Sequence, residues 1–582
     1  MSGRRAPQKL LLDRLRSSPS TAAGAVVFAL ALALWLWRVQ RSVELSDESL
    51  SVGMPLRFVL GDYPFRDDRS VGQIAALFAT PLVAVYHFVV RSNAGIVLFM
   101  RLAYLAYLSA IGLALARAVR GWISPAAALA CAAVTLFYAP YSILQLSYNT
   151  LGGGFALLAM ASSLRVARST SAKEAARHAM IVGFAAAASA CSYPTLGLLF
   201  PVHFATLLVF GRAHLPAGKL ILRFVAGAAT IGVYVLVFLA RSGFDSIRLT
   251  VEFTRAFGLT PPAKMSELLA GVNGMKTNWF TSFAVAGMLT ALAARFRPAV
   301  ILLAVAVPFL AAPTMDVDVC DTMRFFSCVG LFAPFFAVLV ADRRAAFRIL
   351  AIVWFPAVLT GLVTGWTSSN KWNACGHGGF AAMLACTVLA SRACEEAVGT
   401  LRVLASATGL APALALLCAL TGRVFAPSSV YRDIPPLEMT ARVRSGPFLG
   451  LLTSEKRRDM VEQMHADIVA NVQGSRFVLF LPDMPSGYLS ANARPAVPEM
   501  WAMSRPAQSA IDAQVYRERA ADIGLVVVRS CDAGRNWQHW ETCTPTLDAP
   551  ADPLQAVVLE STTEIVQRPD YTVRKLRRAV TP

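Results

Sequence analysis

The stretch Thr21–Trp37, TAAGAVVFALALALWLW, decides how the chain is organised, because it is almost wholly apolar. A helix that crosses a bilayer needs about 20 mostly apolar residues, so this stretch is predicted to cross a membrane. The sequence that follows, Val43–Asp68, reads VELSDESLSVGMPLRFVLGDYPFRDD and contains six acids: Glu44, Asp47, Glu48, Asp62, Asp67 and Asp68. Six carboxylates directly behind a membrane helix form either a hydrated loop or an active site at the membrane surface.

The composition is that of a polytopic membrane protein. Of 582 residues, 56% are hydrophobic and only 15% are charged, which is well below the roughly 25% usual for soluble domains. The net charge of +19 is uneven: the first 420 residues hold 35 Lys and Arg against 17 Asp and Glu, and the rest hold 19 against 18. Lys and Arg mark the cytoplasmic loops of membrane proteins. We therefore attribute the basic excess to the membrane domain and expect no nucleic-acid partner.

The first 420 residues are predicted to form a membrane domain. Residues 1–20 are a basic cytoplasmic tail, and residues 21–420 carry the helices. The first apolar run ends without a small-residue cleavage site, so we expect an uncleaved helix. Thirteen spans are predicted near 21–38, 93–115, 123–140, 149–164, 178–192, 194–211, 221–240, 278–294, 298–313, 325–341, 347–365, 378–391 and 401–420.

One further apolar segment, 71–90, is interpreted as a helix on or dipping into the outer surface, within a first outer loop over 39–92. The charge distribution favours this interpretation over a fourteenth span. With the N-terminus in the cytoplasm, an odd number of spans places the C-terminus on the outer, extracytoplasmic side of the membrane.

Residues 421–582 differ from the rest and are predicted to form an extracytoplasmic α/β domain. Three runs have the pattern of strands, RFVLFL, IGLVVVRS and LQAVVLE, and the run SEKRRDMVEQMHADIVANVQG has helical periodicity. Cys531 and Cys543 fall in this domain, where an oxidising compartment permits a disulfide between them.

The acids of the first outer loop are the strongest candidates for catalysis. Gly61 and Pro64 favour a turn that brings Asp47 and Glu48 close to the pair at 67 and 68. A carboxylate against apolar walls has a raised pKa and serves as a general base. Two acid pairs are also able to hold a divalent cation against a phosphate, so metal dependence stays open.

Three cationic or titratable residues are candidates for binding a donor phosphate. Arg101 lies about two turns inside the second span. An ionisable residue at such a position suggests a functional site. The alternative is a structural arginine whose long side chain extends to the membrane interface. Lys371 and His377 lie in a glycine-rich predicted outer loop, TSSNKWNACGHGGF. The alternative interpretation of this loop is a flexible linker. The sequence has no Walker A motif and no dinucleotide fingerprint, so we expect no nucleotide or organic cofactor.

Several motifs together resemble a known group. SDES behind the first span, then GDYPFRDD and NAGIVLFMRLAYL, resemble the start of GT-C membrane glycosyltransferases, which include protein mannosyltransferases and the aminoarabinose transferase of lipid A. LSYNTLGGGFALLAMASSLR and AASACSYPTLGLLFPVHF resemble the fourth to sixth helices of that group. The chain departs from the group in lacking the Pro-Pro pair that often follows the second acid.

The resemblance implies a fold and an activity. It implies about 13 transmembrane helices, an outer C-terminal domain and a polyprenyl-phosphate-linked sugar donor. The proposed base of the group falls on Asp47, with Glu48 beside it, and its second acid falls on Asp67 or Asp68.

From these features we expect an inverting transferase that moves a hexosyl or pentosyl group to an envelope glycan, lipid or protein. It would act at the outer face of a bacterial inner membrane. A transporter or flippase of lipid-linked sugars, and a non-catalytic envelope scaffold, are the alternatives.

Overall fold

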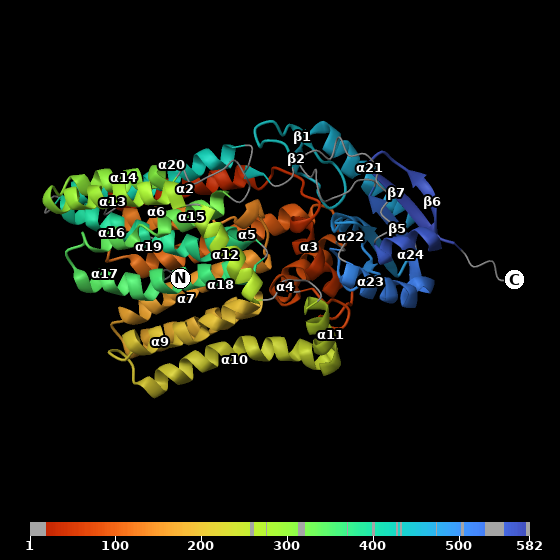
Figure 1. Cartoon of the computed structure of the whole chain (residues 1–582), viewed down its shortest axis with the longest axis horizontal. Coiled ribbons are helices and arrows are strands. Elements are labelled where there is room, and N and C mark those ends of the chain that lie inside the picture. Colours follow the sequence, from red (N-terminus) through yellow and green to blue (C-terminus); the bar gives the residue numbers. More distant parts are fainter. Residues whose placement is uncertain are drawn as a thin grey trace, which may run out of the picture.

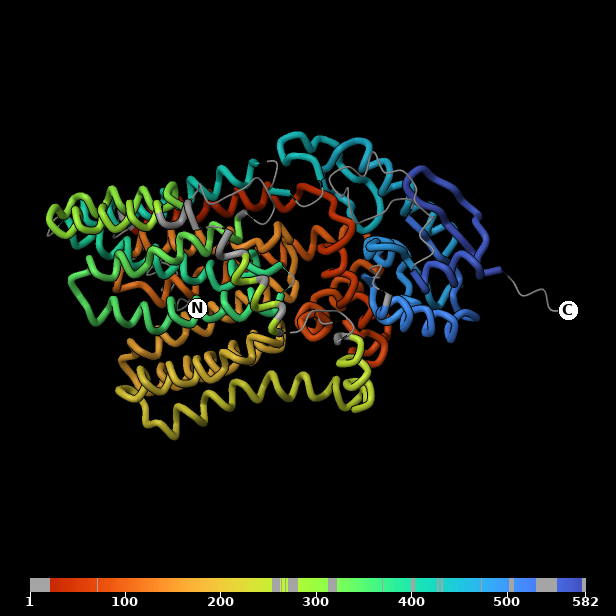
Figure 2. The backbone as a smooth tube through the Cα atoms, viewed as in Figure 1, coloured from red at the N-terminus to blue at the C-terminus, as the bar shows by residue number. Residues whose placement is uncertain are grey.

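The computed structural model is a polytopic helical membrane protein with a small C-terminal α/β domain at one end of its helix bundle (Figure 1). It describes residues 19–70, 72–255, 261–274, 276–311, 321–368, 370–398, 402–426, 429–430, 433–472, 474–501, 506–529 and 552–577. The bundle lies on one side of helices α3 (Asp47–Val59) and α4 (Gln73–Val90), and the C-terminal domain lies on the other, as the backbone trace in Figure 2 shows.

The first half of the bundle is formed by α2 (Pro19–Arg38), α5 (Ile96–Val119), α6 (Pro125–Thr135), α7 (Tyr148–Ala167), α8 (Ala172–Ser192), α9 (Phe200–Gly211) and α10 (Ala217–Ser242). Short 3-10 turns, η1 (Pro140–Ser142) and η2 (Pro194–Leu199), precede α7 and α9. Two helices, α11 (Phe244–Arg255) and α12 (Pro261–Gly274), follow α10.

The second half is formed by α13 (Lys276–Arg295), α14 (Ala299–Ala311), α15 (Asp321–Gly330), α16 (Ala333–Ala337), α17 (Arg343–Ile349), α18 (Phe355–Thr367), α19 (Gly376–Ala397) and α20 (Arg402–Phe425). A π-helical turn, η4 (Leu350–Trp354), joins α17 to α18, and η5 (Lys371–Cys375) leads into α19. Among the described residues, nine helices are long and apolar enough to cross a membrane, and four apolar helices are shorter. The number of thirteen crossings stays a prediction.

Helix α19 is the centre of the second half of the bundle. The apolar part of Lys371–Ala397 is completely buried, and it is rich in Gly, Ala and Cys. A Cβ atom at Gly378 would lie 2.0 Å from the carbonyl oxygen of Ala357 on α18, so only glycine allows this contact. Small residues let membrane helices pack at such short distances, where van der Waals contact supplies the association energy.

The segment predicted to lie at the surface forms α4 (Gln73–Val90), which follows α3 (Asp47–Val59). Both ends of α4 contact the C-terminal domain: before it, the amide of Arg69 donates to Pro498 at 3.4 Å, and after it the amide of Gly95 donates to Gly446 at 3.1 Å. The residues on either side of α4 thus contact the same domain. Helix α4 is also apolar and long enough to span a membrane, so its placement at the surface stays a prediction.

The C-terminal domain is built on a five-stranded sheet with the order β4-β3-β5-β7-β6. Its strands are β3 (Phe477–Leu481), β4 (Arg494–Pro495), β5 (Ile523–Arg529), β6 (Thr562–Gln567) and β7 (Tyr571–Leu576). Strand β3 pairs in parallel with β4 and β5, whereas β7 pairs antiparallel with β5 and β6. Helices α21 (Glu455–Asn471), α22 (Ser486–Ala491), α23 (Pro506–Arg519) and α24 (Pro553–Ser561) pack around the sheet, and a second pair, β1 (Ala441–Arg442) and β2 (Leu452–Thr453), precedes it.

Two of the three strand predictions and the helix prediction are confirmed, as β3, β5 and α21. The third was wrong, because LQAVVLE lies in α24. Asp552 caps this helix by accepting hydrogen bonds from the amides of Leu554 and Gln555, and Pro553 occupies its first turn. Leu554 and Val558 are buried four residues apart, which is helical spacing. Cys531 and Cys543 lie outside the described residues, so their disulfide stays a prediction.

The buried Asp512 on α23 makes the free energy of unfolding of this domain depend on pH. The side chain is buried, and burial raises its pKa to about 8, with Arg69 opposing the rise. An unfolded Asp titrates near 4, so between about pH 4 and 8 the folded state binds the extra proton. Stability therefore falls as pH rises through this window, by at most about 1.4 kcal/mol per pH unit, and levels off above it.

We predict that Asp512→Asn removes this slope and raises the urea midpoint of the domain at pH 8. The measurement is urea-dependent proteolysis of the C-terminal domain in the purified full-length protein from pH 5 to 9. Asp522→Asn, at an exposed position, is the matched control and should keep the wild-type slope. An unchanged slope in Asp512→Asn contradicts the assignment.

Candidate active site

The first acid of the loop, Glu44, organises the beginning of α3. Its carboxylate accepts hydrogen bonds from the amides of Ser46, at 2.9 Å, and Glu48, at 2.6 Å. Its carbonyl oxygen accepts from the hydroxyl of Ser49 at 2.6 Å. The first turn of a helix has amides without partners in the helix itself, and Glu44 satisfies two amides at this point. This acid therefore has a structural role.

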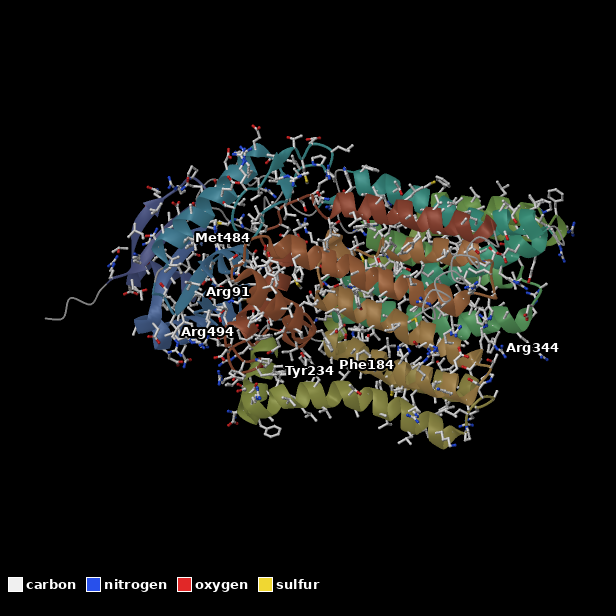
Figure 3. The ribbon with its side chains drawn as sticks, turned by 180° about the vertical axis from the view of Figure 1, so that it is seen from behind. Arg91, Phe184, Tyr234, Arg344, Met484 and Arg494 are labelled. Atoms are coloured by element: carbon white, nitrogen blue, oxygen red, sulfur yellow. The ribbon has the colours of Figure 1, made fainter. Side chains whose placement is uncertain are left out.

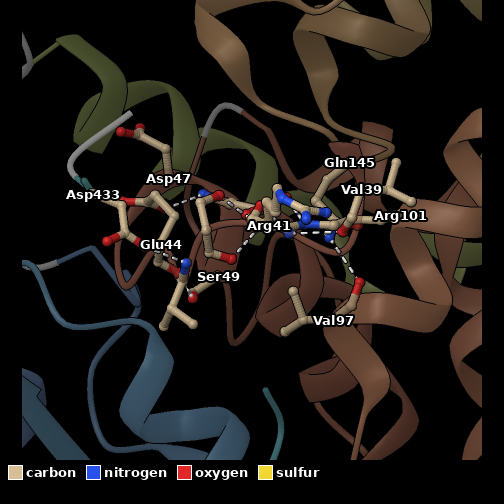
Figure 4. A network of polar contacts seen from close by, with 12 residues as sticks. Val39, Arg41, Glu44, Asp47, Ser49, Val97, Arg101, Gln145 and Asp433 are labelled. Carbon is tan, nitrogen blue, oxygen red and sulfur yellow. Dashed lines mark hydrogen bonds and ion pairs between the residues drawn. The ribbon is translucent and has the colours of Figure 1, made fainter. Parts of the chain in front are cut away.

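The third acid, Glu48, forms a buried ion pair with Arg101 of α5. Arg101 Nε donates to Glu48 Oε1 at 2.7 Å, and Nη2 contacts Oε2. Arg101 is completely buried, and Glu48 is 3% exposed. Gln145 adds a hydrogen bond of 3.3 Å to the same carboxylate (Figure 4). A buried charge is tolerated only with such complete pairing.

The remaining N–H groups of Arg101 bind the chain just after α2. Nη1 donates to the carbonyl oxygens of Val39 and Arg41, both at 2.9 Å, and Nη2 donates to that of Ser42 at 3.1 Å. With the two bonds to Glu48, all five N–H groups have acceptors. The pair therefore joins α2, α3 and α5, and the assignments of Arg101 to a donor phosphate and of Glu48 to catalysis stay predictions.

A second arginine, Arg57 at the end of α3, binds two further acids of the loop. It forms ion pairs with Asp62, at 2.8 Å, and with Asp68, at 3.1 Å. It also donates to the carbonyl oxygen of Pro498 at 3.0 Å, and Arg494 contacts the other oxygen of Asp62. Because Pro498 and Arg494 belong to the C-terminal domain, this cluster attaches that domain to the first outer loop.

Asp67 and Asp68 differ in their electrostatics. Burial acts to raise the pKa of Asp67, but hydrogen bonds from Arg66 and from the amide of Tyr63 outweigh it, and the pKa is lowered. For Asp68 burial dominates, so its pKa is raised although Arg57 opposes the change. Both side chains are buried and occupied by arginines. These contacts hold the loop and the domain together, and the assignment of Asp67 and Asp68 to catalysis stays a prediction.

The two acid pairs of the loop are not joined into one metal site. Glu48 is held by Arg101, and Asp68 is held by Arg57. Within the described ranges, no group of three His, Cys, Asp or Glu side chains converges in a manner that would hold a metal ion.

Asp47 is the one acid of the six that is partly exposed; the other five are buried. It is the first residue of α3, where the positive end of the helix dipole favours an ionised carboxylate. Figure 4 shows its carboxylate turned away from Arg101. The side chain instead interacts electrostatically with Tyr148, the first residue of α7.

A row of aromatic side chains leads from Tyr148 into the bundle. The ring of Tyr148 lies 5.8 Å from that of Tyr193, and Tyr193 lies 5.9 Å from the ring of His377. His377 is buried in the first turn of α19, and its Nδ1 is 3.1 Å from the hydroxyl of Tyr138. Its Nε2 is buried and has no hydrogen-bond partner among the described residues. We call Tyr148, Tyr193 and His377 the aromatic row.

The loop between α18 and α19, predicted from the sequence to be an outer loop, lies beside this row. The hydroxyl of Tyr193 faces the side chains of Ser368 and Thr367. Lys371 in the same loop is exposed and has a left-handed backbone, with φ of 50°. This conformation is uncommon for a residue with a side chain, and strained positions of this kind are often functional.

Two further cations bind this loop. Lys264 Nζ donates to the carbonyl oxygen of Thr367 at 2.9 Å, and Arg324 Nε donates to Asn373 Oδ1 at 2.7 Å. Neither cation was predicted from the sequence, and neither was Tyr193. The sequence did not predict these three residues because they lie far from Asp47 along the chain, and no local sequence pattern links them to it.

We predict that Arg101→Met destabilises the protein by about 3–5 kcal/mol, the usual cost of leaving a buried charge without its partner. The double variant Glu48→Leu/Arg101→Met should recover part of this loss, because neither charge then remains. The measurement is thermal unfolding of the detergent-solubilised protein, together with its abundance in membranes. Arg444→Met, at an exposed position, is the control. Normal stability of Arg101→Met would contradict the structural role.

Comparisons with known proteins find solved structures to which this chain is similar, and three of them are described here. No family model matches the sequence, and no curated protein matches it. ArnT from Cupriavidus metallidurans bound to undecaprenyl phosphate aligns over 95% of this chain and 98% of its own, with 13% identity and a TM-score of 0.44. ArnT in the apo state aligns over 96% and 98%, with 12% identity and a TM-score of 0.39. The oligosaccharyltransferase of Archaeoglobus fulgidus, in complex with zinc and sulfate, aligns over 86% and 68%, with 12% identity and a TM-score of 0.41.

Proposed function

We propose that the protein is an inverting GT-C type glycosyltransferase that moves a sugar from a polyprenyl phosphate to an envelope acceptor. One observation carries the proposal: among six acids of the first outer loop, only Asp47 is partly exposed. The other five are buried. Glu44 accepts hydrogen bonds from backbone amides at the start of α3, and arginines bind the other four, which are Glu48, Asp62, Asp67 and Asp68. Asp47 is thus the acid that a substrate reaches. The sequence resemblance to GT-C enzymes names the same residue.

In the proposed reaction, Asp47 accepts the proton of the acceptor hydroxyl. The acceptor oxygen forms a new bond to the anomeric carbon of the sugar, while the bond from that carbon to the phosphate oxygen breaks. The electron pair of that bond leaves with the polyprenyl phosphate, which gains one negative charge. A single displacement inverts the anomeric centre and needs one base and no covalent intermediate.

The leaving phosphate requires positive charge close to it. Lys371 is exposed and is one of the three candidates predicted from the sequence, with Arg101 and His377. Lys264 and Arg324 bind the same loop. Preorganised cations stabilise charge that develops in the transition state. The aromatic row lies between this loop and Asp47, and aromatic rings are suited to contacting a sugar face.

The proposal places the reaction at the outer face of a bacterial inner membrane. Figure 3 shows Arg344 at the end of the bundle farthest from the C-terminal domain, and α17, which carries it, also carries Arg343 and Arg348. Under the positive-inside rule this end faces the cytoplasm. The C-terminal domain, α3 and Asp47 then face outward, where a lipid-linked sugar and an envelope glycan, lipid or protein acceptor meet. A divalent cation is an open variable of the reaction.

We predict that Asp47→Asn abolishes transfer, with a loss of at least about 100-fold, as expected when a general base is removed. The assay is complementation of a deletion strain, with envelope glycans and polyprenyl-linked sugars measured by mass spectrometry. The unused lipid-linked sugar should accumulate, and its mass identifies the sugar. Parallel assays of purified protein with EDTA, and with added Mg²⁺ or Mn²⁺, test the metal requirement.

Asp245→Asn, at an exposed position on α11, is the matched control and should behave as wild type. Membrane abundance is measured for each variant. If Asp47→Asn is abundant and restores the wild-type glycans, the proposed base is wrong. If Asp47→Asn changes the membrane leaflet in which the lipid-linked sugar is found but leaves transfer intact, a flippase is favoured.

We predict that Lys371→Gln raises the KM for the polyprenyl-linked donor about tenfold, the equivalent of roughly 1.4 kcal/mol. Lys371→Arg should keep most of the affinity because it keeps the charge. The measurement is steady-state transfer by purified protein at varied donor concentration. Lys456→Gln in the C-terminal domain is the control, and an unchanged KM in Lys371→Gln removes this residue from the donor site.

A further inference from the structure

We propose that a cavity between α8 and α10 binds the headgroup of an anionic phospholipid. The cavity has a volume of about 550 Å³, and it is lined by Ser171, Lys173, Glu174, Arg177 and Met180 from the α8 region and by Arg223 from α10. Helix α7 begins at Tyr148, beside Asp47, and ends at Ala167, shortly before Ser171. The cavity is therefore at the opposite end of the bundle from the candidate active site, and it is independent of glycosyl transfer.

The cavity is positively charged. Lys173, Arg177 and Arg223 are all exposed. The only acid in the lining, Glu174, forms an ion pair with Arg165, so its charge is already compensated. Three cations thus face the cavity without a compensating acid, which favours an anionic occupant.

These cations differ from others at the same end of the bundle. Arg168 donates to the carbonyl oxygens of Ala118 and Arg120, so its guanidinium is used within the protein. Lys173 and Arg223, in contrast, have no hydrogen bond or ion pair with any described residue. A charge that the protein does not use itself is available to a ligand.

The apolar surroundings favour a lipid over a soluble anion. Met180 is 41% exposed beside Arg177, and Leu222 and Val225 are 66% and 53% exposed on either side of Arg223. A phospholipid presents its phosphate and its acyl chains to these two kinds of surface at once. Basic pockets between transmembrane helices are known to bind anionic lipid headgroups.

The two helices that form the cavity are held rigidly. A Cβ atom at Gly183 of α8 would lie 1.9 Å from the carbonyl oxygen of Phe224, and one at Gly227 of α10 would lie 1.9 Å from that of Met180. Glycine at both positions lets the backbones touch directly. The cavity is therefore preformed, and a headgroup binds without rearranging the helices.

The test uses the full-length protein in nanodiscs and compares wild type with Lys173→Gln/Arg177→Gln/Arg223→Gln. Retained lipids are counted by native mass spectrometry, and thermal unfolding is followed in dioleoylphosphatidylglycerol and in dioleoylphosphatidylcholine. We expect the wild type to retain one more phosphatidylglycerol per chain than the triple variant does, with at least tenfold tighter binding. The single variant Arg223→Gln should show a smaller loss.

The matched control is Arg212→Gln/Arg344→Gln/Arg348→Gln, which removes three exposed charges from the same end without touching the lining. This control should bind phosphatidylglycerol as wild type does. Equal binding by wild type and the lining variant overturns the proposal, and so does an equal loss in the control. Saturation by inorganic phosphate or glycerol 3-phosphate, with no preference for phosphatidylglycerol, would overturn a lipid as the occupant.

Discussion

The position of the candidate base depends on the buried ion pair between Glu48 and Arg101. Removing two charges from water costs several kcal/mol per ion, so the pair must be completely satisfied to persist. Arg101 meets this condition with five acceptors, three of which are carbonyl oxygens at the end of the first helix. The same interaction fixes the start of α3, and Asp47 precedes Glu48 directly. The partly exposed carboxylate of Asp47 is therefore held in place by the buried ion pair of its neighbour Glu48.

The second constraint is the arginine cluster that joins the loop to the C-terminal domain. Arg57 binds Asp62 and Asp68 from its own loop and Pro498 from the domain. Arg494 adds a contact from the domain to Asp62. A loop with six acids would repel itself without these cations. Their presence turns an acidic stretch into a rigid support for α3 and α4.

The sequence was sufficient to predict the helical membrane fold and the small C-terminal α/β region. Apolar length and charge density are local properties, so they are visible in a single sequence. The division of labour among the acids was not visible, because it depends on partners far along the chain: Arg101 is 53 residues from Glu48, and Arg494 is 432 residues from Asp62. Likewise, LQAVVLE has the composition of a strand, but the preceding Asp552 and Pro553 make it a helix.

The contact between Arg494 and Asp62 has a consequence for biogenesis. The loop is made early, and the arginine that completes it is made more than four hundred residues later. Until the ribosome has finished the C-terminal domain, Asp62 lacks this partner and α3 lacks its outer support. The membrane helices then assemble around a loop that is not yet in its final form. The loop that carries Asp47 therefore reaches its final set of contacts only after the C-terminal domain has been made, and a product truncated before Arg494 lacks this contact.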